Sequence, residues 1–322
     1  MHRHHRGLWP VAILLVALCF SGCASAERQP APYDAAGTPY FQDPFWWYYW
    51  VGISAAHARA FSGKGATVAI VDTGVLFGHE DLGNVKDGVD LCTNKLKAED
   101  TRNGHGTELA GIVGGKPNGR ATRGIAYEAS ITPYKVVCGT TNAVIVYQGV
   151  ARALDEKPDV LLLALGPWPG DTDDRGNSVD DLLNVLATRN TQTLFVVASV
   201  WDDRYYKRPA WTMLPNVLLV AAMTLDRTQT REVHYNVKRG DIWAPGQDIG
   251  TSSIEPDPSA PQHDRYRMQG TSAAAAIVAG CAALRKPIRL RSGADLKNDL
   301  LDAAEPANLP DGKKRLKCSD RL

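Results

Sequence analysis

The chain has 322 residues, of which 44% are hydrophobic, so it is long enough to bury a substantial core in one α/β domain. With 36 basic and 35 acidic residues its formal net charge is +1, which argues against nucleic acid or an acidic ligand as a partner of the whole chain. The short basic run at residues 313–317 is interpreted as a solvated surface segment.

The N-terminus has the pattern of an export signal. Residues 1–10 are basic, residues 11–20 form an apolar run, and small residues follow. Because this run is too short to span a bilayer as a helix, we predict a secretory signal peptide over residues 1–22.

The segment Phe20 to Cys23 is similar to a bacterial lipobox, although leucine is usual in place of Phe20. The similarity predicts that Cys23 is the first mature residue and carries lipid, which would anchor the protein to a membrane without spanning it. Ala24 then favours the outer membrane of a Gram-negative cell, with the protein in the periplasm. Ordinary signal cleavage after Ala24 or Ala26 is the alternative.

Residues 23–42 predict a short linker rich in proline, alanine and tyrosine, and residues 43–322 predict a single domain. The aromatic run at residues 45–50 has two interpretations. It either rests at a bilayer interface or packs on the domain, and we favour packing.

The apolar, β-branched run at residues 67–71 predicts a buried parallel strand. Asp72 follows directly, at the carboxyl end of the strand, where open α/β sheets place their sites. The chain therefore predicts a three-layer α/β domain with a mainly parallel central sheet and helices on both faces. Further strands are expected near residues 131–137, 160–165, 194–199 and 217–222.

Two more polar side chains stand at the starts of predicted helices. His105 lies between Gly104 and Gly106 and opens an apolar-periodic stretch. Ser272 precedes a run of strong helix formers at residues 273–284, so its hydroxyl is expected at a helix N-terminus. A carboxylate, an imidazole and a hydroxyl are the groups that activate serine for attack on an acyl carbon.

The segments VAIVDTGV, NGHGTELAG and MQGTSAAAAIVAG, in the order Asp, His, Ser, resemble the subtilisin-like serine proteases (subtilases, peptidase S8 family). The likeness extends over residues 43–318, including GIAYEASITPYKVV and PDVLLLALG. It implies a subtilisin-like fold and a serine endopeptidase acting on polypeptides. Ser272 would be the nucleophile, His105 the base and Asp72 the group that orients it.

The resemblance also implies substrate-binding positions. The strand ending near Lys135 would pair with bound peptide, and Ala164, Leu165 and Gly166 would line the other side of the cleft. Val200 stands where relatives have a glycine in the wall of the P1 pocket, so we predict a shallow pocket that prefers small P1 residues.

One position departs from the family pattern. Trp201 replaces the asparagine whose amide binds the oxyanion of the tetrahedral intermediate. The indole of Trp201 or a protonated Asp202 replaces that donor, or the enzyme is slow and narrow in specificity, or the fold is a pseudoenzyme that binds extended peptides. We favour a working protease because Asp72, His105 and Ser272 are all present; an esterase or transpeptidase is a weaker alternative.

Cysteines favour an oxidising compartment. Cys19 lies in the signal and Cys23 at the lipid site, which leaves four cysteines, two disulfides and three connectivities. We favour Cys92 with Cys138 and Cys281 with Cys318. None of the cysteines has the C-x-x-C spacing that would indicate a metal site.

No cofactor is expected from the sequence. The resemblance makes calcium a candidate, but no acidic loop has a ligand spacing that identifies a site. The short stretch at residues 23–42 also lacks the length of the inhibitory propeptide usual in secreted subtilases. We therefore expect the protein to fold alone or with a folding or inhibitory partner.

Overall fold

The computed structural model describes residues 46–58, 60–118, 123–139, 142–166, 176, 178–199, 208–225, 232–234, 240–254, 267–286, 292–307 and 314–318. The predicted signal peptide, Cys23, the linker, Val200, Trp201 and Asp202 lie outside these residues. Within them, no helix combines the length and the apolar character needed to cross a membrane.

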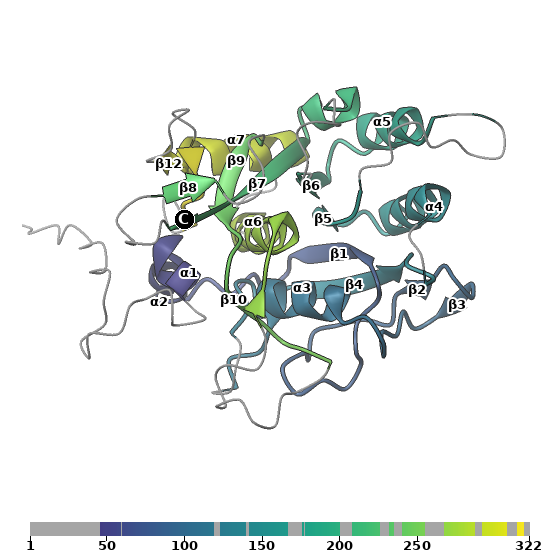
Figure 1. The fold of residues 1–322 in the computed structure, drawn as a ribbon, viewed down its shortest axis with the longest axis horizontal. Coiled ribbons are helices and arrows are strands. Elements are labelled where there is room, and N and C mark those ends of the chain that lie inside the picture. The colour runs from purple at the N-terminus through teal and green to yellow at the C-terminus, as the bar shows by residue number, and fades with distance from the viewer. Residues whose placement is uncertain are drawn as a thin grey trace, which may run out of the picture.

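The described chain is built on an 11-stranded sheet with the order β12-β13-β9-β7-β6-β5-β1-β4-β2-β3, in which β8 also pairs with β7 (Figure 1). Its centre is parallel: β1 pairs with β4 and β5, β5 with β6, β6 with β7, and β7 with β9. These strands are β1 (Thr67–Asp72), β4 (Ser130–Lys135), β5 (Val160–Leu163), β6 (Leu194–Ala198), β7 (Val217–Leu225) and β9 (Ile242–Pro245).

Short strands form antiparallel pairs at both edges, β2–β3 and β12–β13, and β8 is antiparallel to the last residues of β7. A separate two-stranded ribbon joins β10 to β11. The bounds are β2 (Val89–Asp90), β3 (Lys95–Leu96), β8 (Glu232–His234), β10 (Ile249–Gly250), β11 (Arg267–Met268), β12 (Glu305–Pro306) and β13 (Lys314–Arg315).

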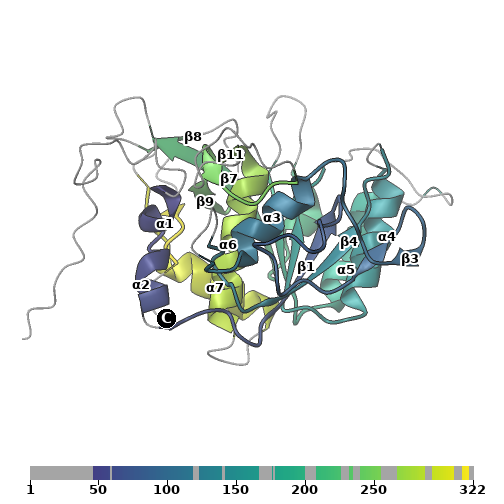
Figure 2. The same cartoon turned by 90° about the horizontal axis from the view of Figure 1, so that it is seen from below.

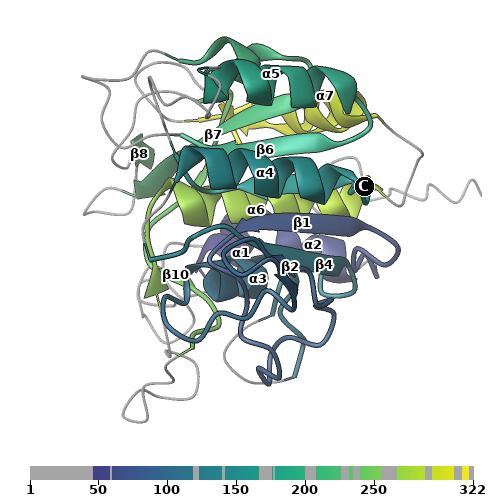
Figure 3. The ribbon, with the colours of Figure 1, turned by 90° about the vertical axis from the view of Figure 1, so that its right-hand side faces the viewer.

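Helices cover both faces of the sheet, because successive side chains of a strand point to opposite faces. On β1, Val68 and Ile70 enter one core with α3, α6 and α7, while Ala69 and Val71 enter the other with α4 and α5. Figure 3 views the molecule from the side of α4 and α5. The helices are α3 (His105–Gly114), α4 (Ala143–Leu154), α5 (Val179–Arg189), the 3-10 helix η2 (Ala210–Met213), α6 (Thr271–Arg285) and α7 (Gly293–Ala303). The predicted three-layer α/β fold is confirmed.

The alanine-rich helix α6 lies almost entirely inside the protein, against α3 and the strands β5, β6, β7 and β9. Small side chains allow the helix to approach the sheet closely over its whole length. The helix therefore places Ser272, its second residue, at the carboxyl edge of the sheet.

The aromatic N-terminal segment packs on the domain as two short helices, α1 (Trp46–Trp50) and α2 (Ile53–Ala58). The side chains of Trp46, Trp47 and Tyr48 are buried. The Cys318 N–H donates to the carbonyl of Val51 at 2.7 Å, so the N-terminal segment also holds the C-terminal strand region, which lies beside α1 in Figure 2. Of the two interpretations, the structure shows packing for the residues it describes.

Candidate active site

A catalytic-type pair forms where β1 ends and α3 begins. The Nδ1 nitrogen of His105 lies 2.7 Å from Oδ1 of Asp72. The backbone N–H of Thr73 donates to the same oxygen at 2.8 Å. The Asp72 side chain is 0% exposed, whereas the His105 side chain is 29% exposed. A fully buried carboxylate thus binds Nδ1 of the imidazole, while the imidazole itself remains partly accessible to solvent and ligands.

The glycines that flank His105 have a steric cause. Gly104 has φ 85°, a left-handed conformation that favours glycine. A Cβ on Gly106 would lie 2.1 Å from the carbonyl oxygen of Gly74, so only glycine lets α3 start this close to the end of β1. The motif therefore brings the imidazole to the Asp72 carboxylate.

A buried network behind this pair holds the loop before His105. Oδ2 of Asp100 accepts from the hydroxyl of Thr73 at 2.5 Å and from Gly104 N–H at 2.9 Å. Oδ1 of Asp100 accepts from Arg102 N–H and Asn103 N–H, both at 3.0 Å. The Thr73 hydroxyl in turn accepts from Gly106 N–H at 2.9 Å. One carboxylate therefore links the end of β1 to the start of α3.

Sequence reasoning did not select Thr73 or Asp100. A sequence signal for Asp100 existed, because an aspartate often caps the N–H groups two and three residues further on. Its bond to Thr73 joins positions that are 27 apart in the chain, and no local pattern announces that contact.

Ser272 reaches the same edge of the sheet from α6. Its hydroxyl donates to the carbonyl of Ala164, just after β5, at 3.2 Å. Thr271, the first residue of α6, donates its hydroxyl to the carbonyl of Ser199 at 2.7 Å. Among the described contacts, the Ser272 hydroxyl bonds to Ala164 and not to His105; such bonds are often long in ligand-free sites and tighten when substrate binds.

The pKa of His105 is raised. Burial of the imidazole lowers its pKa, but the charge and hydrogen bond of Asp72, with the charges of Glu108 and Asp100, outweigh burial and raise the pKa from 6.5 to about 9. The imidazole is therefore charged at neutral pH in the ligand-free protein, and it becomes neutral and able to act as a base as the pH rises through about 9.

Comparison with known proteins decides the family. The model of the subtilase family (peptidase S8) matches residues 63–316. The chain belongs to the subtilase family. It is thus a serine-type endopeptidase by family, and the predicted resemblance is confirmed.

Relatives of this subtilase include named proteases. It is 28% identical over 283 residues to the "Alkaline protease" of Shouchella clausii, covering 86% of this chain and 69% of that protein. It is also 28% identical over 241 residues to the "Major intracellular serine protease" of Bacillus subtilis (strain 168), covering 71% and 70%.

Solved structures share the fold of this subtilase. Fervidolysin from Fervidobacterium pennivorans, described as a keratinolytic enzyme related to subtilisin, has a TM-score of 0.67 at 22% identity, with coverage of 85% of this chain and 44% of that one. The MycP3 protease from the type VII (ESX-3) secretion system has a TM-score of 0.65 at 24% identity, with coverage of 85% and 86%. At these identities the likeness establishes the fold alone.

The expected substrate-binding positions flank the Asp72–His105 pair in this subtilase. Lys135, the last residue of β4, is in register with Asp72, and its ammonium donates to the carbonyl of Glu99 at 2.7 Å. Ala164, Leu165 and Gly166 follow β5 on the other side of β1. The described part of the site thus lies between the ends of β4 and β5.

Two disulfides are present in the described chain. Cys92 is bonded to Cys138 and Cys281 to Cys318, with Cα separations of 5.4 and 5.5 Å. These are the pairs that the sequence analysis favoured. Among the described residues, no group of three or more His, Cys, Asp and Glu side chains is arranged to hold a metal ion.

Proposed function

We propose that this subtilase hydrolyses peptide bonds through an acyl-enzyme on Ser272. The observation that carries the proposal is the 2.7 Å contact between a buried Asp72 and His105, with Ser272 at the same edge of the sheet. The Ser272 oxygen attacks the scissile carbonyl, and His105 Nε2 takes the hydroxyl proton. His105 then gives that proton to the leaving amine, and water releases the acyl group by the same steps. Asp72 keeps the imidazole proton on Nδ1 throughout.

The hydrogen-bond donors to the oxyanion of the tetrahedral intermediate determine the turnover that we expect. The backbone N–H of Ser272 lies at the N-terminus of α6, which supports its role as one donor. We assign the second to the Trp201 indole or to Asp202, in place of the family asparagine. Complete loss of such a donor costs a factor of about 10² to 10³ in turnover, and neither replacement is the amide that relatives use, so we expect an enzyme that is slow or narrow in specificity.

The substrate is proposed to lie extended between two backbone edges, one at Lys135 and one at Ala164 to Gly166. Val200 stands where relatives have a glycine in the wall of the P1 pocket, so we expect a shallow pocket and faster cleavage of peptides with P1 alanine than of matched peptides with P1 phenylalanine. Faster cleavage of the phenylalanine peptide would overturn this assignment.

We also propose that the protein acts at a membrane surface outside the cytoplasm. The signal pattern and the lipobox-like segment ending at Cys23 support a lipid anchor in the outer membrane, facing the periplasm. Metabolic labelling with a radioactive fatty acid should mark the wild-type protein and leave Cys23→Ser unlabelled.

A fluorophosphonate probe tests the catalytic proposal, because covalent capture needs an activated serine. Wild-type protein should be labelled, whereas Ser272→Ala and His105→Ala should not. Absence of labelling in wild-type protein that is shown to be folded would overturn the protease assignment. The replacement of the oxyanion asparagine by Trp201 would then favour a peptide-binding pseudoenzyme.

A further inference from the structure

A cavity of about 750 Å³ lies beside the Asp72–His105 pair, on the β4 side of β1. Its lining includes Thr73 and the loop before His105, with Arg102 and Asn103. The end of β4, with Lys135 and Val137, also lines the cavity, as do Cys92 and Cys138, which are joined by a disulfide. The lining thus includes chain neighbours of both Asp72 and His105, and the Cys92–Cys138 disulfide links two of its segments.

The carboxylates that line this cavity are largely occupied by protein donors. Asp100 accepts four hydrogen bonds, from Thr73, Arg102, Asn103 and Gly104. Glu99 pairs with the Lys97 ammonium at 2.8 Å and accepts Phe77 N–H at 3.1 Å.

Asp90 uses one oxygen to accept Cys92 N–H and Thr93 N–H, at 2.8 and 3.2 Å. In the described contacts, Oδ2 of Asp90 is the main carboxylate oxygen of the lining that could still accept a hydrogen bond from a ligand. Most carboxylate oxygens of the lining thus accept hydrogen bonds from the loops that carry them.

The two cationic side chains of the lining, Arg102 and Lys135, use few of their hydrogen-bond donors in the described contacts. A guanidinium has five N–H donors and an ammonium three. Among the described contacts, the Arg102 guanidinium has no hydrogen bond or ion pair, and the Lys135 ammonium makes one bond, to the Glu99 carbonyl. The cavity can therefore offer several charge-assisted hydrogen bonds to a carboxylate.

The proposed substrate path directs one side chain to this cavity. The substrate is proposed above to lie between the ends of β4 and β5, and we take its P1 side chain to face the β5 side. The next residue of the extended peptide then points toward the opposite wall, because successive side chains alternate. That opposite wall is the end of β4. On this path the residue that precedes P1, called P2, is the one directed toward Arg102 and Lys135.

We propose that this cavity selects substrates with aspartate or glutamate at P2, whose carboxylate Arg102 and Lys135 bind. The inference rests on the peptide hydrolysis proposed above. It names the class of polypeptide that the site prefers, and makes Arg102 and Lys135 specificity-determining residues.

Three fluorogenic peptides that share P1 alanine and differ only at P2, as glutamate, glutamine or lysine, test the proposal. We expect kcat/KM for the glutamate peptide to exceed that for glutamine by about tenfold, and for lysine by more. Arg102→Gln should remove most of this preference, and Lys135→Met should reduce it. Lys95→Gln is the matched control, because it removes one positive charge from the neighbouring hairpin outside the lining and should leave the ratio unchanged.

Binding separates this proposal from the catalytic one. The same peptides are titrated against Ser272→Ala by fluorescence anisotropy. Tighter binding of the glutamate peptide, abolished by adding Arg102→Gln, supports the inference even when wild-type protein cleaves nothing, which would overturn only the protease assignment. Equal binding and equal cleavage across the three peptides, a preference for lysine, or no binding of any of them overturns the P2 proposal.

Discussion

The imidazole of His105 and the carboxylate of Asp72 are joined through Nδ1 and Oδ1 at 2.7 Å, and Thr73 N–H reaches the same oxygen at 2.8 Å. Because the buried carboxylate only accepts, it keeps a proton on Nδ1. The lone pair of a neutral imidazole is then on Nε2, the nitrogen that must take the proton of Ser272.

Asp72→Asn should therefore lower kcat by about 10⁴ while leaving KM close to the wild-type value. An amide at this position can donate to Nδ1 and stabilise the wrong tautomer. Steady-state kinetics on the P1 alanine peptide measures the effect, and Asp155→Asn, on the exposed end of α4, serves as the control. A loss of less than tenfold would remove Asp72 from the mechanism.

The raised pKa of His105 predicts that the enzyme is most active at alkaline pH. Catalysis needs the neutral imidazole, so kcat/KM should rise about tenfold per pH unit below the pKa and level off above about 9. Glu108→Gln removes one of the charges that raise this pKa, so its profile should level off at lower pH. A wild-type profile that levels off near pH 6.5 would contradict this prediction.

The free energy of unfolding should also depend on pH through the protonation of His105. The folded pKa of His105, about 9, lies above the ordinary value of 6.5, so folded protein binds more protons than unfolded protein between these values. The contribution of this proton to stability is complete below pH 6.5 and is lost as the pH rises through 9. Denaturant unfolding across this window should show a decline that is smaller in His105→Gln; identical slopes would contradict the assignment.

The sequence predicted the parts of the site that local patterns announce. The apolar run of β1 placed Asp72, and the flanking glycines and apolar period placed His105 at a helix start. The strand predicted to residue 137 ends at Lys135 instead, because pairing with β1 stops at Asp72.

Other features depend on contacts between distant segments. The strands β2, β3, β12 and β13 have two residues each, too few for an alternating pattern, and only their partners define them. The contact of Thr73 with Asp100 and the cavity beside it arise in the same way. Trp201 and Asp202 lie outside the described residues, so their role stays a prediction.

The two disulfides should have different effects on function. Each closes a loop, with sequence separations of 46 residues for Cys92–Cys138 and 37 for Cys281–Cys318, so each should stabilise the protein by about 3 to 4 kcal/mol. Only Cys92–Cys138 borders the cavity and the end of β4. Replacing Cys281 and Cys318 by alanine should lower stability and leave KM unchanged in folded protein.

Replacing Cys92 and Cys138 by alanine should lower stability and also raise KM for the P2 glutamate peptide. Calorimetry and steady-state kinetics on both double variants give the comparison. An equal change in KM for the two pairs would contradict a special role for the Cys92–Cys138 wall.

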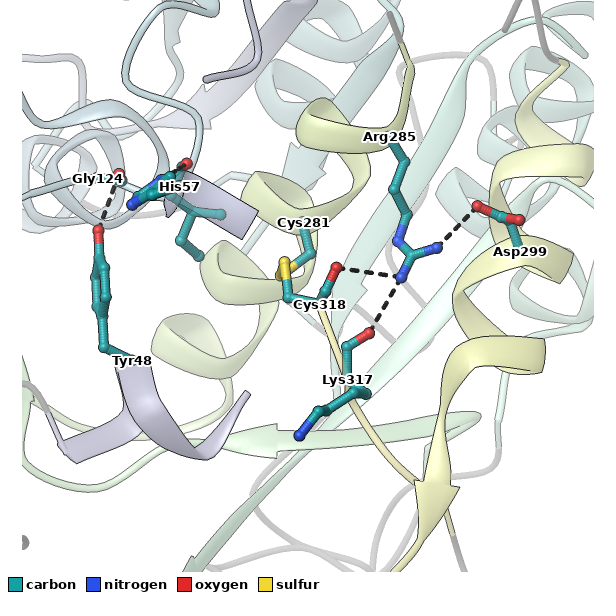
Figure 4. The surroundings of a disulfide bond; sticks show 9 residues. Tyr48, His57, Gly124, Cys281, Arg285, Asp299, Lys317 and Cys318 are labelled. Carbon is teal, nitrogen blue, oxygen red and sulfur yellow. Dashed lines mark hydrogen bonds and ion pairs between the residues drawn. A yellow bond between two sulfur atoms is a disulfide. The ribbon is translucent and has the colours of Figure 1, made fainter. Parts of the chain in front are cut away.

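The buried guanidinium of Arg285 carries the last prediction. Its side chain is 1% exposed, and Nη1 donates to Asp299 Oδ2 at 2.9 Å. Nη2 donates to the carbonyls of Lys317 and Cys318 at 3.3 and 3.2 Å (Figure 4). Arg285 thus links the end of α6, the helix of Ser272, to α7 and to the C-terminal segment.

Arg285→Met should lower the free energy of unfolding by about 3 to 5 kcal/mol, because it removes this donor from a carboxylate and two carbonyls in a poorly solvated site. Arg285→Lys should fall between wild type and methionine, since an ammonium keeps the charge but not the planar fork. Arg152→Met is the matched control: Arg152 pairs with Asp155 on the surface, with its side chain 45% exposed, and should cost less than about 1 kcal/mol.

The double variant Arg285→Met, Asp299→Leu separates the ion pair from the carbonyl contacts. If the unpaired charge of the partly exposed Asp299 is the main cost in Arg285→Met, removing it should recover part of the lost stability. If the carbonyl bonds dominate, the double variant should be no more stable than Arg285→Met. Denaturant unfolding of wild type, Arg285→Met, Asp299→Leu and the double variant completes the cycle. An Arg285→Met value within about 1 kcal/mol of wild type would show that this link is not needed to hold the C-terminal segment.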